Sequence, residues 1–143
     1  MFAALAKRWR NQFVSGKPDR ALRGERGEKL AARLLRKRGY KILYRNFRGR
    51  TGGEIDLVCR DRDTLVFVEV KTRGSEDFGR PIETIKPEQR ERIARGALAW
   101  LRMLDDPDVL FRFDVVEVIA APGAEPRLEL IKNAFSLPKS YLY

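Results

Sequence analysis

Three ionisable side chains on two neighbouring segments could together hold a metal ion. Asp56 lies in EIDLVCR (54–60), and Glu69 and Lys71 end the apolar segment LVFVEVKT (65–72). Carboxylate oxygens bind Mg²⁺ or Mn²⁺, and a nearby ammonium group can orient a metal-bound water or stabilise charge that develops on a phosphate. Asp56, Glu69 and Lys71 are therefore candidate catalytic residues of a phosphodiesterase, with Asp56 and Glu69 as its metal ligands.

The apolar setting of Glu69 favours this interpretation. An ionised glutamate that ends a buried strand is costly unless it is paired or bound to a cation, and two close carboxylates repel each other. Each residue alone would more often belong to an ordinary ion pair, such as Glu69 with Lys71. The pattern D-x12-E-x-K across two adjacent strands shifts the balance towards a metal site.

The composition restricts the available chemistry. The chain has 143 residues, no histidine and one cysteine, Cys59. Catalysis by Ser-His-Asp or Cys-His groups, His-ligated zinc and a disulfide within the chain are therefore excluded. A single cysteine is compatible with a reducing cytoplasm, where we expect the protein.

Positive charge is concentrated near the start of the chain. Residues 1–50 contain 16 Lys and Arg against 3 Asp and Glu, whereas residues 51–143 contain 14 against 17, which together give the net charge of +10. Basic side chains bind the phosphates of nucleic acids by releasing condensed counterions. DNA or RNA is therefore the expected partner, and the alternative is a basic surface that only aids solubility.

The elements that must position these residues follow from apolar periodicity and turn signals. The sequence predicts a helix over 19–39, strands over 40–44, 54–60 and 65–72, a helix over 87–104, and strands over 112–119 and 128–132. The order αβββαββ indicates one layered α/β domain over 19–135, between a basic N-terminal tail (1–18) and a C-terminal tail (136–143). A turn at 61–64 joins the second and third strands into a hairpin. Side-chain alternation then lets the acids of the two strands converge at one end of the hairpin.

Basic residues near this hairpin are candidates for binding a phosphate backbone. They lie on the first helix, in the loop 46–53 and at the end of the third strand. The candidates are Arg23, Arg26, Arg33, Arg48, Arg50 and Arg73.

The chain shows no sign of a membrane span. No apolar stretch is long enough to cross a bilayer, and the first residues lack the order of a signal peptide. Residues 1–17 could form a basic segment that touches a membrane surface, which would make the protein an adaptor. We expect a frayed tail instead.

Six segments resemble the YraN family of small, poorly characterised bacterial proteins. They are GERGEKLAARLLRKRGYKIL (24–43), RNFRGRTGGEIDLV (45–58), LVFVEVKTR (65–73), FGRPIETI (78–85), RFDVV (112–116) and IKNAF (131–135). The resemblance implies the restriction-endonuclease-like or PD-(D/E)xK fold, with three layers and a mixed central β-sheet flanked by helices. It also implies a Mg²⁺-dependent nuclease for DNA or RNA. Its resolvase-like relatives act as dimers on branched nucleic acid, which makes structured substrates and a homodimer further expectations.

Carried over residue by residue, the resemblance makes Asp56 and Glu69 the metal ligands and Lys71 the catalytic lysine. It adds Glu28, an extra glutamate of the helix, as a candidate catalytic residue, unless Glu28 only balances the neighbouring basic side chains. Glu54 of the GEID motif is a further candidate catalytic residue that supports the metal site or binds a second metal, and the alternative is a pair with Arg48 or Arg50.

The sequence departs from the family at one position. Gln89 stands where the family usually has a lysine. Its amide remains a candidate for binding a substrate phosphate or a water, and the loss of a charge puts the role of that position in doubt. Asp114 of the RFD motif is expected to anchor Arg112, and the alternative is that it reaches the edge of the site. The alternative function is a nucleic-acid-binding module that keeps a nuclease fold without catalysis.

Overall fold

The computed structural model describes residues 19–74, 85–106, 108–120 and 123–141. Its elements are α2 (Asp19–Lys37), β1 (Lys41–Arg48), β2 (Glu54–Asp61), β3 (Thr64–Arg73), α3 (Pro87–Met103), β4 (Leu110–Ile119), β5 (Arg127–Phe135) and the 3-10 turn η3 (Lys139–Tyr141). The predicted order αβββαββ is confirmed. The expectations for residues 1–18, including a membrane-binding segment, lie outside the described residues.

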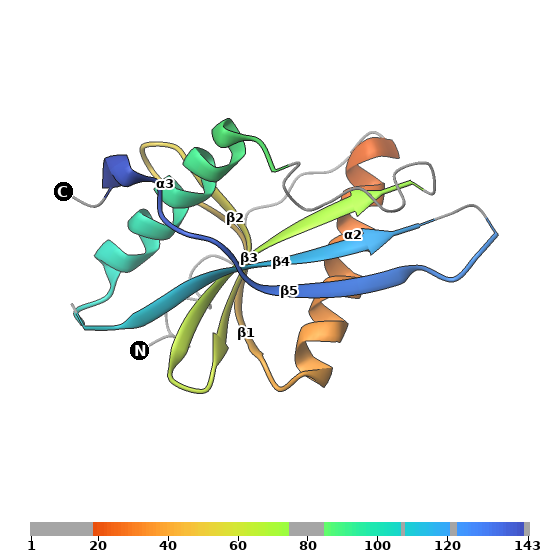
Figure 1. Ribbon diagram of the computed structural model, residues 1–143, viewed down its shortest axis with the longest axis horizontal. Coiled ribbons are helices and arrows are strands. Elements are labelled where there is room, and N and C mark those ends of the chain that lie inside the picture. The colour runs from red at the N-terminus through yellow and green to blue at the C-terminus, as the bar shows by residue number, and fades with distance from the viewer. Residues whose placement is uncertain (1–18, 75–84, 107, 121–122, 142–143) are drawn as a thin grey trace.

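One mixed sheet forms the centre of the fold (Figure 1). Its five strands follow the chain order from β1 to β5. Neighbouring strands are antiparallel except for β3 and β4, which run parallel because α3 carries the chain back between them. The predicted α/β class is therefore confirmed, with a mixed five-stranded sheet.

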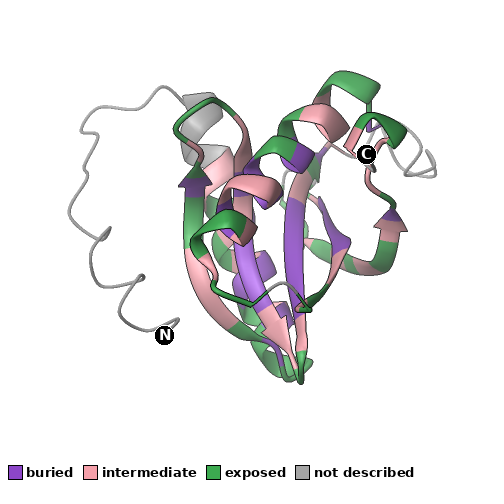
Figure 2. Ribbon diagram, turned by 90° about the vertical axis from the view of Figure 1, so that its left-hand side faces the viewer, coloured by how far each residue is buried: buried purple, intermediate pink, exposed green. Residues whose placement is uncertain are grey.

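The two helices cover opposite faces of the sheet. Ile93, Ala97 and Trp100 of α3 pack with Phe67 and other residues of one face. Ala31, Ala32 and Leu35 of α2 pack against the other face. Figure 2 shows the buried residues along the central strands between the helices. Three layers result, as expected for a sheet that is apolar on both faces.

The largest differences from the predicted strand bounds are in β1 and β5. The segment 46–53 reads as a polar loop, yet β1 continues to Arg48. Phe47 explains the difference because its ring is buried and lies 5.2 Å from the ring of Trp100. β5 likewise continues to Phe135, which stacks on Phe113 at 4.9 Å. A buried aromatic residue near the end of each strand, Phe47 or Phe135, therefore explains why both strands are longer than predicted.

Glycines allow α3 to approach β2 closely. A methyl group on Gly96 would lie 2.9 Å from Cγ1 of Ile55 and 3.0 Å from the backbone nitrogen of Glu54. Gly53, before β2, likewise leaves no room for a side chain against the backbone of Gly96. The start of β2, two residues before Asp56, is thus fixed by direct contact with α3.

Within the described part of the chain, the helices are too short or too polar to cross a membrane.

Candidate metal centre

Asp56 and Glu69 come together where the pairing of β2 with β3 ends. The last paired residues are Leu57 and Val68, so one further step places Asp56 opposite Glu69. The Asp56 carboxylate accepts a hydrogen bond of 2.8 Å from the backbone N–H of Val70. If the pairing of the two strands continued, that N–H would donate its hydrogen bond to a backbone carbonyl of β2. The side chain of Asp56 thus replaces a backbone acceptor, and its carboxylate lies beside Glu69.

The two acids share one environment with little water. Glu69 is 8% exposed, and burial raises its pKa to about 8, an effect to which the charge of Asp56 adds. Burial also raises the pKa of Asp56, whereas the hydrogen bond from Val70 acts against that rise. Two such acids keep a proton between them near neutral pH unless a cation takes its place.

Lys71 follows Glu69 on the same face of β3. Phe67 of this face packs in the cluster that contains α3, while Val66 and Val68 pack against α2. Lys71 Nζ lies 3.5 Å from Oε1 of Gln89 in the first turn of α3. The same oxygen accepts a hydrogen bond of 3.2 Å from the backbone N–H of Lys86. Gln89 thus links the lysine to the start of α3.

Arg92 is a residue of this site that the sequence did not identify. Its positive charge opposes the rise of pKa at both Asp56 and Glu69, so it lies near both acids. It follows Gln89 by three residues and therefore lies on the same side of α3. The sequence could have indicated Arg92 only through its spacing of three residues from Gln89. That spacing points to the site only when the contact between Gln89 and Lys71 is known.

The donor set suits Mg²⁺ or Mn²⁺. Asp56 and Glu69 offer oxygen ligands, and Mg²⁺ often uses one or two carboxylates with waters and substrate phosphate in its other positions. The described residues contain no group of three or more His, Cys, Asp or Glu placed to hold a metal.

The other acidic candidates lie nearby in different settings. Glu54 is ion-paired with Arg48 at 3.7 Å, the second of the two roles expected for it. Its charge also contributes to the raised pKa of Asp56. Glu28 is half-buried on α2, next to Gly27, which packs against Thr72 on the other face of β3.

Arg73 lies in a buried ion pair. Its Nη2 is 3.1 Å from Oε1 of Glu117 on β4, and the two side chains are 7% and 8% exposed. Glu117 Oε1 has no partner in hydrogen-bond geometry, so the contact is ionic. Arg73 is thus held inside the protein, away from the surface where a phosphate backbone would pass.

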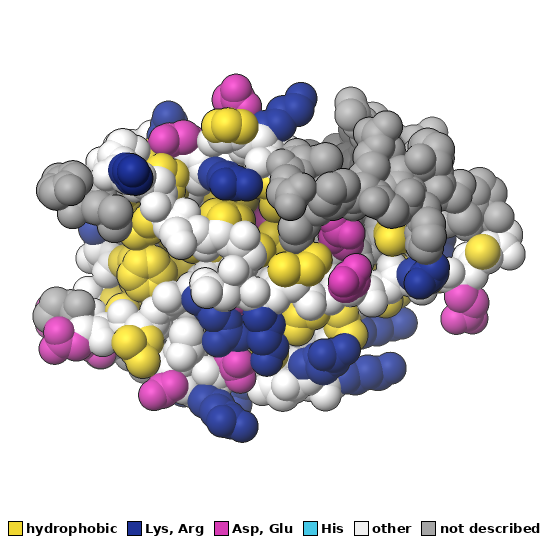
Figure 3. Space-filling model, viewed as in Figure 1, with side chains coloured by type: hydrophobic (Ala, Val, Ile, Leu, Met, Phe, Trp, Pro, Cys, Tyr) yellow, Lys and Arg dark blue, Asp and Glu magenta, His cyan; other side chains and the backbone are white. Residues whose placement is uncertain are grey.

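The remaining basic candidates separate into two groups. Arg26 and Arg33 are exposed on α2, whereas Arg48 and Arg50 are exposed beside the loop before β2. The side chain of Arg23 lies outside those described. Figure 3 shows Lys and Arg side chains gathered along the lower edge of that view, below β5. Positive surface is therefore not confined to the neighbourhood of the acid pair.

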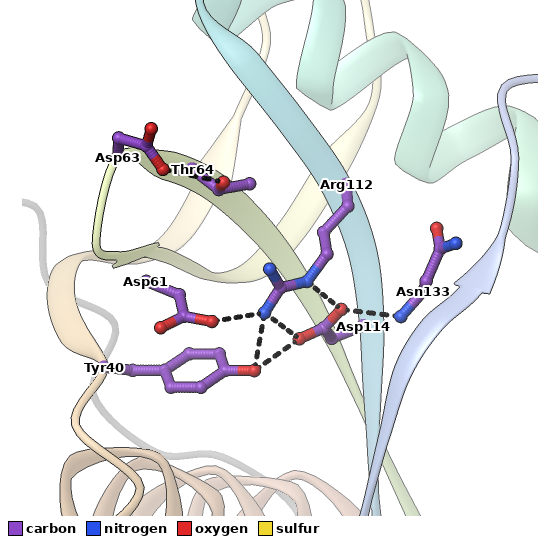
Figure 4. Close-up of polar contacts among 7 residues, drawn as sticks. All are labelled: Tyr40, Asp61, Asp63, Thr64, Arg112, Asp114 and Asn133. Carbon is purple, nitrogen blue, oxygen red and sulfur yellow. Dashed lines mark hydrogen bonds and ion pairs between the residues drawn. The ribbon is translucent and has the colours of Figure 1, made fainter.

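Asp114 anchors Arg112, as expected, on the opposite face of the sheet (Figure 4). Asp114 is fully buried and accepts hydrogen bonds from Arg112 Nε (2.9 Å), Tyr40 Oη (2.8 Å) and the backbone N–H of Asn133 (2.9 Å). Arg112 also contacts Asp61 at 2.8 Å. The network joins Tyr40, the residue before β1, to β2, β4 and β5, and these contacts are those of a structural residue.

Comparisons with known proteins give one consistent family. Residues 27–118 match the model of the uncharacterised protein family UPF0102. A UPF0102 protein of Nocardia farcinica is 47% identical over 117 residues, which cover 82% of this chain and 91% of the relative. A UPF0102 protein of Trichlorobacter lovleyi is 46% identical over 123 residues, which cover 85% of this chain and 95% of the relative. One of Geobacter sulfurreducens is 48% identical over 114 residues, which cover 80% of this chain and 88% of the relative. The matched region includes both strands of the acid pair.

Proposed function

The chain belongs to the uncharacterised protein family UPF0102, the YraN family that its motifs resemble, and we propose that it is a Mg²⁺- or Mn²⁺-dependent nuclease. The observation that carries the proposal is that the side chains of Asp56 and Glu69 lie next to each other just beyond the last paired residues of β2 and β3, with Lys71 two residues after Glu69. Two carboxylates this close repel each other unless they share a proton or bind a cation, and their oxygens suit a hard cation.

We include the restriction-endonuclease-like fold in the proposal. A mixed sheet with one helix on each face, and an acid from each strand of a hairpin, agrees with that fold. Branched or structured DNA or RNA as the substrate, and a homodimer as the active form, enter by analogy with resolvases, which is a weaker warrant than the site itself.

Each residue has a distinct part in the proposed reaction. Asp56 and Glu69 hold the cation, which when bound would polarise a phosphate and activate water. The Lys71 ammonium orients the attacking water or stabilises the charge that develops on the phosphate oxygens. Gln89, through its oxygen 3.5 Å from Lys71 Nζ, restricts where that ammonium can lie.

A cleavage assay tests the proposal. The purified chain is incubated with Mg²⁺ or Mn²⁺ and a panel of single-stranded, duplex, flap and four-way junction DNA and RNA. We expect cleavage of at least one substrate, and a loss of about 100-fold or more in Glu69→Gln and Lys71→Met. The matched controls Glu125→Gln and Lys41→Met alter exposed residues and should cleave like the unmodified protein.

The alternative, a nucleic-acid-binding module without catalysis, predicts a different pattern. The protein would bind members of the panel and cut none of them with either cation. Cleavage that persists in Glu69→Gln would also overturn the proposed site, because it would assign the activity to other residues or to a contaminant.

A further inference from the structure

The acid pair opens towards α3 and not towards α2. Glu69 and Lys71 share the face of β3 on which α3 packs, and Gln89 of α3 contacts Lys71. α2 covers the opposite face. Its C-terminal half lies near the far end of β2, since Arg36 is close enough to Cys59 to influence that thiol. A strand bound along this half of α2 would have the sheet between it and Glu69.

The loop before β2 packs on α3 and brings two groups of arginines together. A methyl group on Gly49 would lie 2.9 Å from Cβ of Ala99, and one on Gly52 would lie 3.6 Å from Nη1 of Arg95. The guanidinium of Arg95 therefore lies over the loop that contains Arg50. The loop and the exposed side of α3 form one continuous surface.

Arg92 connects this surface to the acid pair. It precedes Arg95 by three residues on the same side of α3 and follows Gln89 by three, about 4.5 Å along the helix axis in each case. Arg92 and Arg95 are both exposed. Among the described residues, neither takes part in an ion pair, so both guanidinium groups can receive a phosphate.

Building on the proposed nuclease function, we propose that nucleic acid reaches the acid pair along α3. The surface that carries its backbone, here termed the α3 track, consists of Arg48, Arg50, Arg92 and Arg95. Guanidinium groups bind phosphate through paired hydrogen bonds, and such contacts position a strand without reading its sequence. Arg92, at the end of the track, places a phosphate beside Asp56 and Glu69. The C-terminal half of α2, although basic, is not part of this path.

A comparison of two double variants with equal charge change tests the α3 track. Arg92→Ala/Arg95→Ala removes two positive charges from α3, and Arg33→Ala/Arg36→Ala removes two exposed charges from α2. Binding of fluorescein-labelled single-stranded and four-way junction DNA is measured by anisotropy in EDTA, over a range of salt concentrations. EDTA prevents cleavage, so the result does not depend on whether the acid pair binds a metal.

We expect the α3 variant to bind roughly tenfold or more weakly at low salt, since charge-assisted hydrogen bonds are lost. The slope of log K against log salt should become shallower by about 1.4 on single strands and about 1.8 on duplex arms, for two lost phosphate contacts. Arg92→Lys/Arg95→Lys should keep the slope. The α2 variant should lose much less affinity.

Equal losses in the two double variants, or a larger loss in the α2 variant, would overturn the α3 track. If the binding assay gave that result while Glu69→Gln still lost cleavage, the nuclease proposal would stand and only the α3 track would be wrong. Conversely, if the α3 variant alone lost affinity for DNA and the unmodified protein cleaved no substrate, the α3 track would stand and the nuclease proposal would be wrong.

Discussion

At the scale of single residues, the acid pair makes the stability of the metal-free protein depend on pH. Glu69 has a pKa of about 8 in the folded chain, against 4.5 for an ordinary glutamate. Between these values the folded state holds a proton that the unfolded state releases. The free energy of unfolding should therefore fall as pH rises from about 4.5 to about 8, and the loss should then be complete.

We expect the free energy of unfolding to fall by roughly 1–3 kcal/mol across this range. The fall is smaller than about 1.36 kcal/mol for each pH unit because Glu69 shares its proton with Asp56. Urea unfolding in EDTA at several pH values measures it. Glu69→Gln, which cannot titrate, should remove this part of the pH dependence. An identical dependence in the variant and the unmodified protein would show that Glu69 is ionised throughout.

Asp114 provides a contrasting test of a residue with a structural role. Asp114→Ala leaves Arg112 Nε, the hydroxyl of Tyr40 and the backbone N–H of Asn133 without their acceptor, and should cost about 3–5 kcal/mol in the free energy of unfolding. The exposed control Asp105→Ala should change it by less than about 0.5 kcal/mol. Chemical denaturation measures both.

The affinity of Asp114→Ala for Mn²⁺, measured below its melting temperature, should be unchanged. A loss of metal binding in this variant would instead assign Asp114 to the site, the alternative that its buried contacts disfavour.

Sequence reasoning reached the acids of the site but not their surroundings. Alternation along a hairpin brings Asp56 and Glu69 together, because strand neighbours follow from local pairing. Arg92 and Glu117 could not be identified in this way. Their positions depend on how α3 docks and on the parallel register of β3 with β4, which pairs Lys71 with Glu117 across 46 positions of sequence. No local pattern encodes such long-range contacts.

At the scale of elements, the contact between α3 and β2 sets the position of Asp56. Gly96→Ala would press a methyl group against Ile55 and Glu54. Overpacking of this kind costs about 1–3 kcal/mol, which outweighs the gain of roughly 1 kcal/mol in helix propensity. We expect Gly96→Ala to lower the melting temperature and to weaken Mn²⁺ binding, as measured by thermal shift and calorimetry.

Gly24→Ala on α2 is the matched control. A methyl group at Gly24 meets nothing within 4 Å, so the substitution should stabilise the helix by roughly 0.5–1 kcal/mol. Unchanged metal affinity in Gly96→Ala would mean that the start of β2 does not depend on this contact.

The types and order of the elements were predictable, whereas their ends were less so. Strong periodicity fixed the two helices and the hairpin. β1 and β5 were predicted too short because polar residues, Arg45 and Asn46 in β1 and Lys132 and Asn133 in β5, separate Phe47 and Phe135 from the apolar part of each strand. Their burial depends on Trp100 and Phe113, which lie far away in sequence.

At the scale of the whole molecule, the sheet divides the basic surface into two. Residues 1–50 contain most of the excess positive charge, and the sequence analysis placed candidate phosphate-binding arginines both on the first helix and in or beside the loop 46–53. The fold places α2 and that loop against different faces of the sheet. Of the two, the loop is the one that packs on α3. Charge counting cannot show this division, because it depends on the layer order.

The central claim is that Asp56 and Glu69 together hold one divalent cation. Crystals soaked in Mn²⁺ and measured at a wavelength with strong manganese anomalous scattering test it directly. We predict a single anomalous peak in the site within about 2.0–2.4 Å of an oxygen of each carboxylate, absent from crystals of Glu69→Gln. The account would be contradicted if no peak lay between Asp56 and Glu69 at saturating Mn²⁺ and the two carboxylates contacted only each other or arginines.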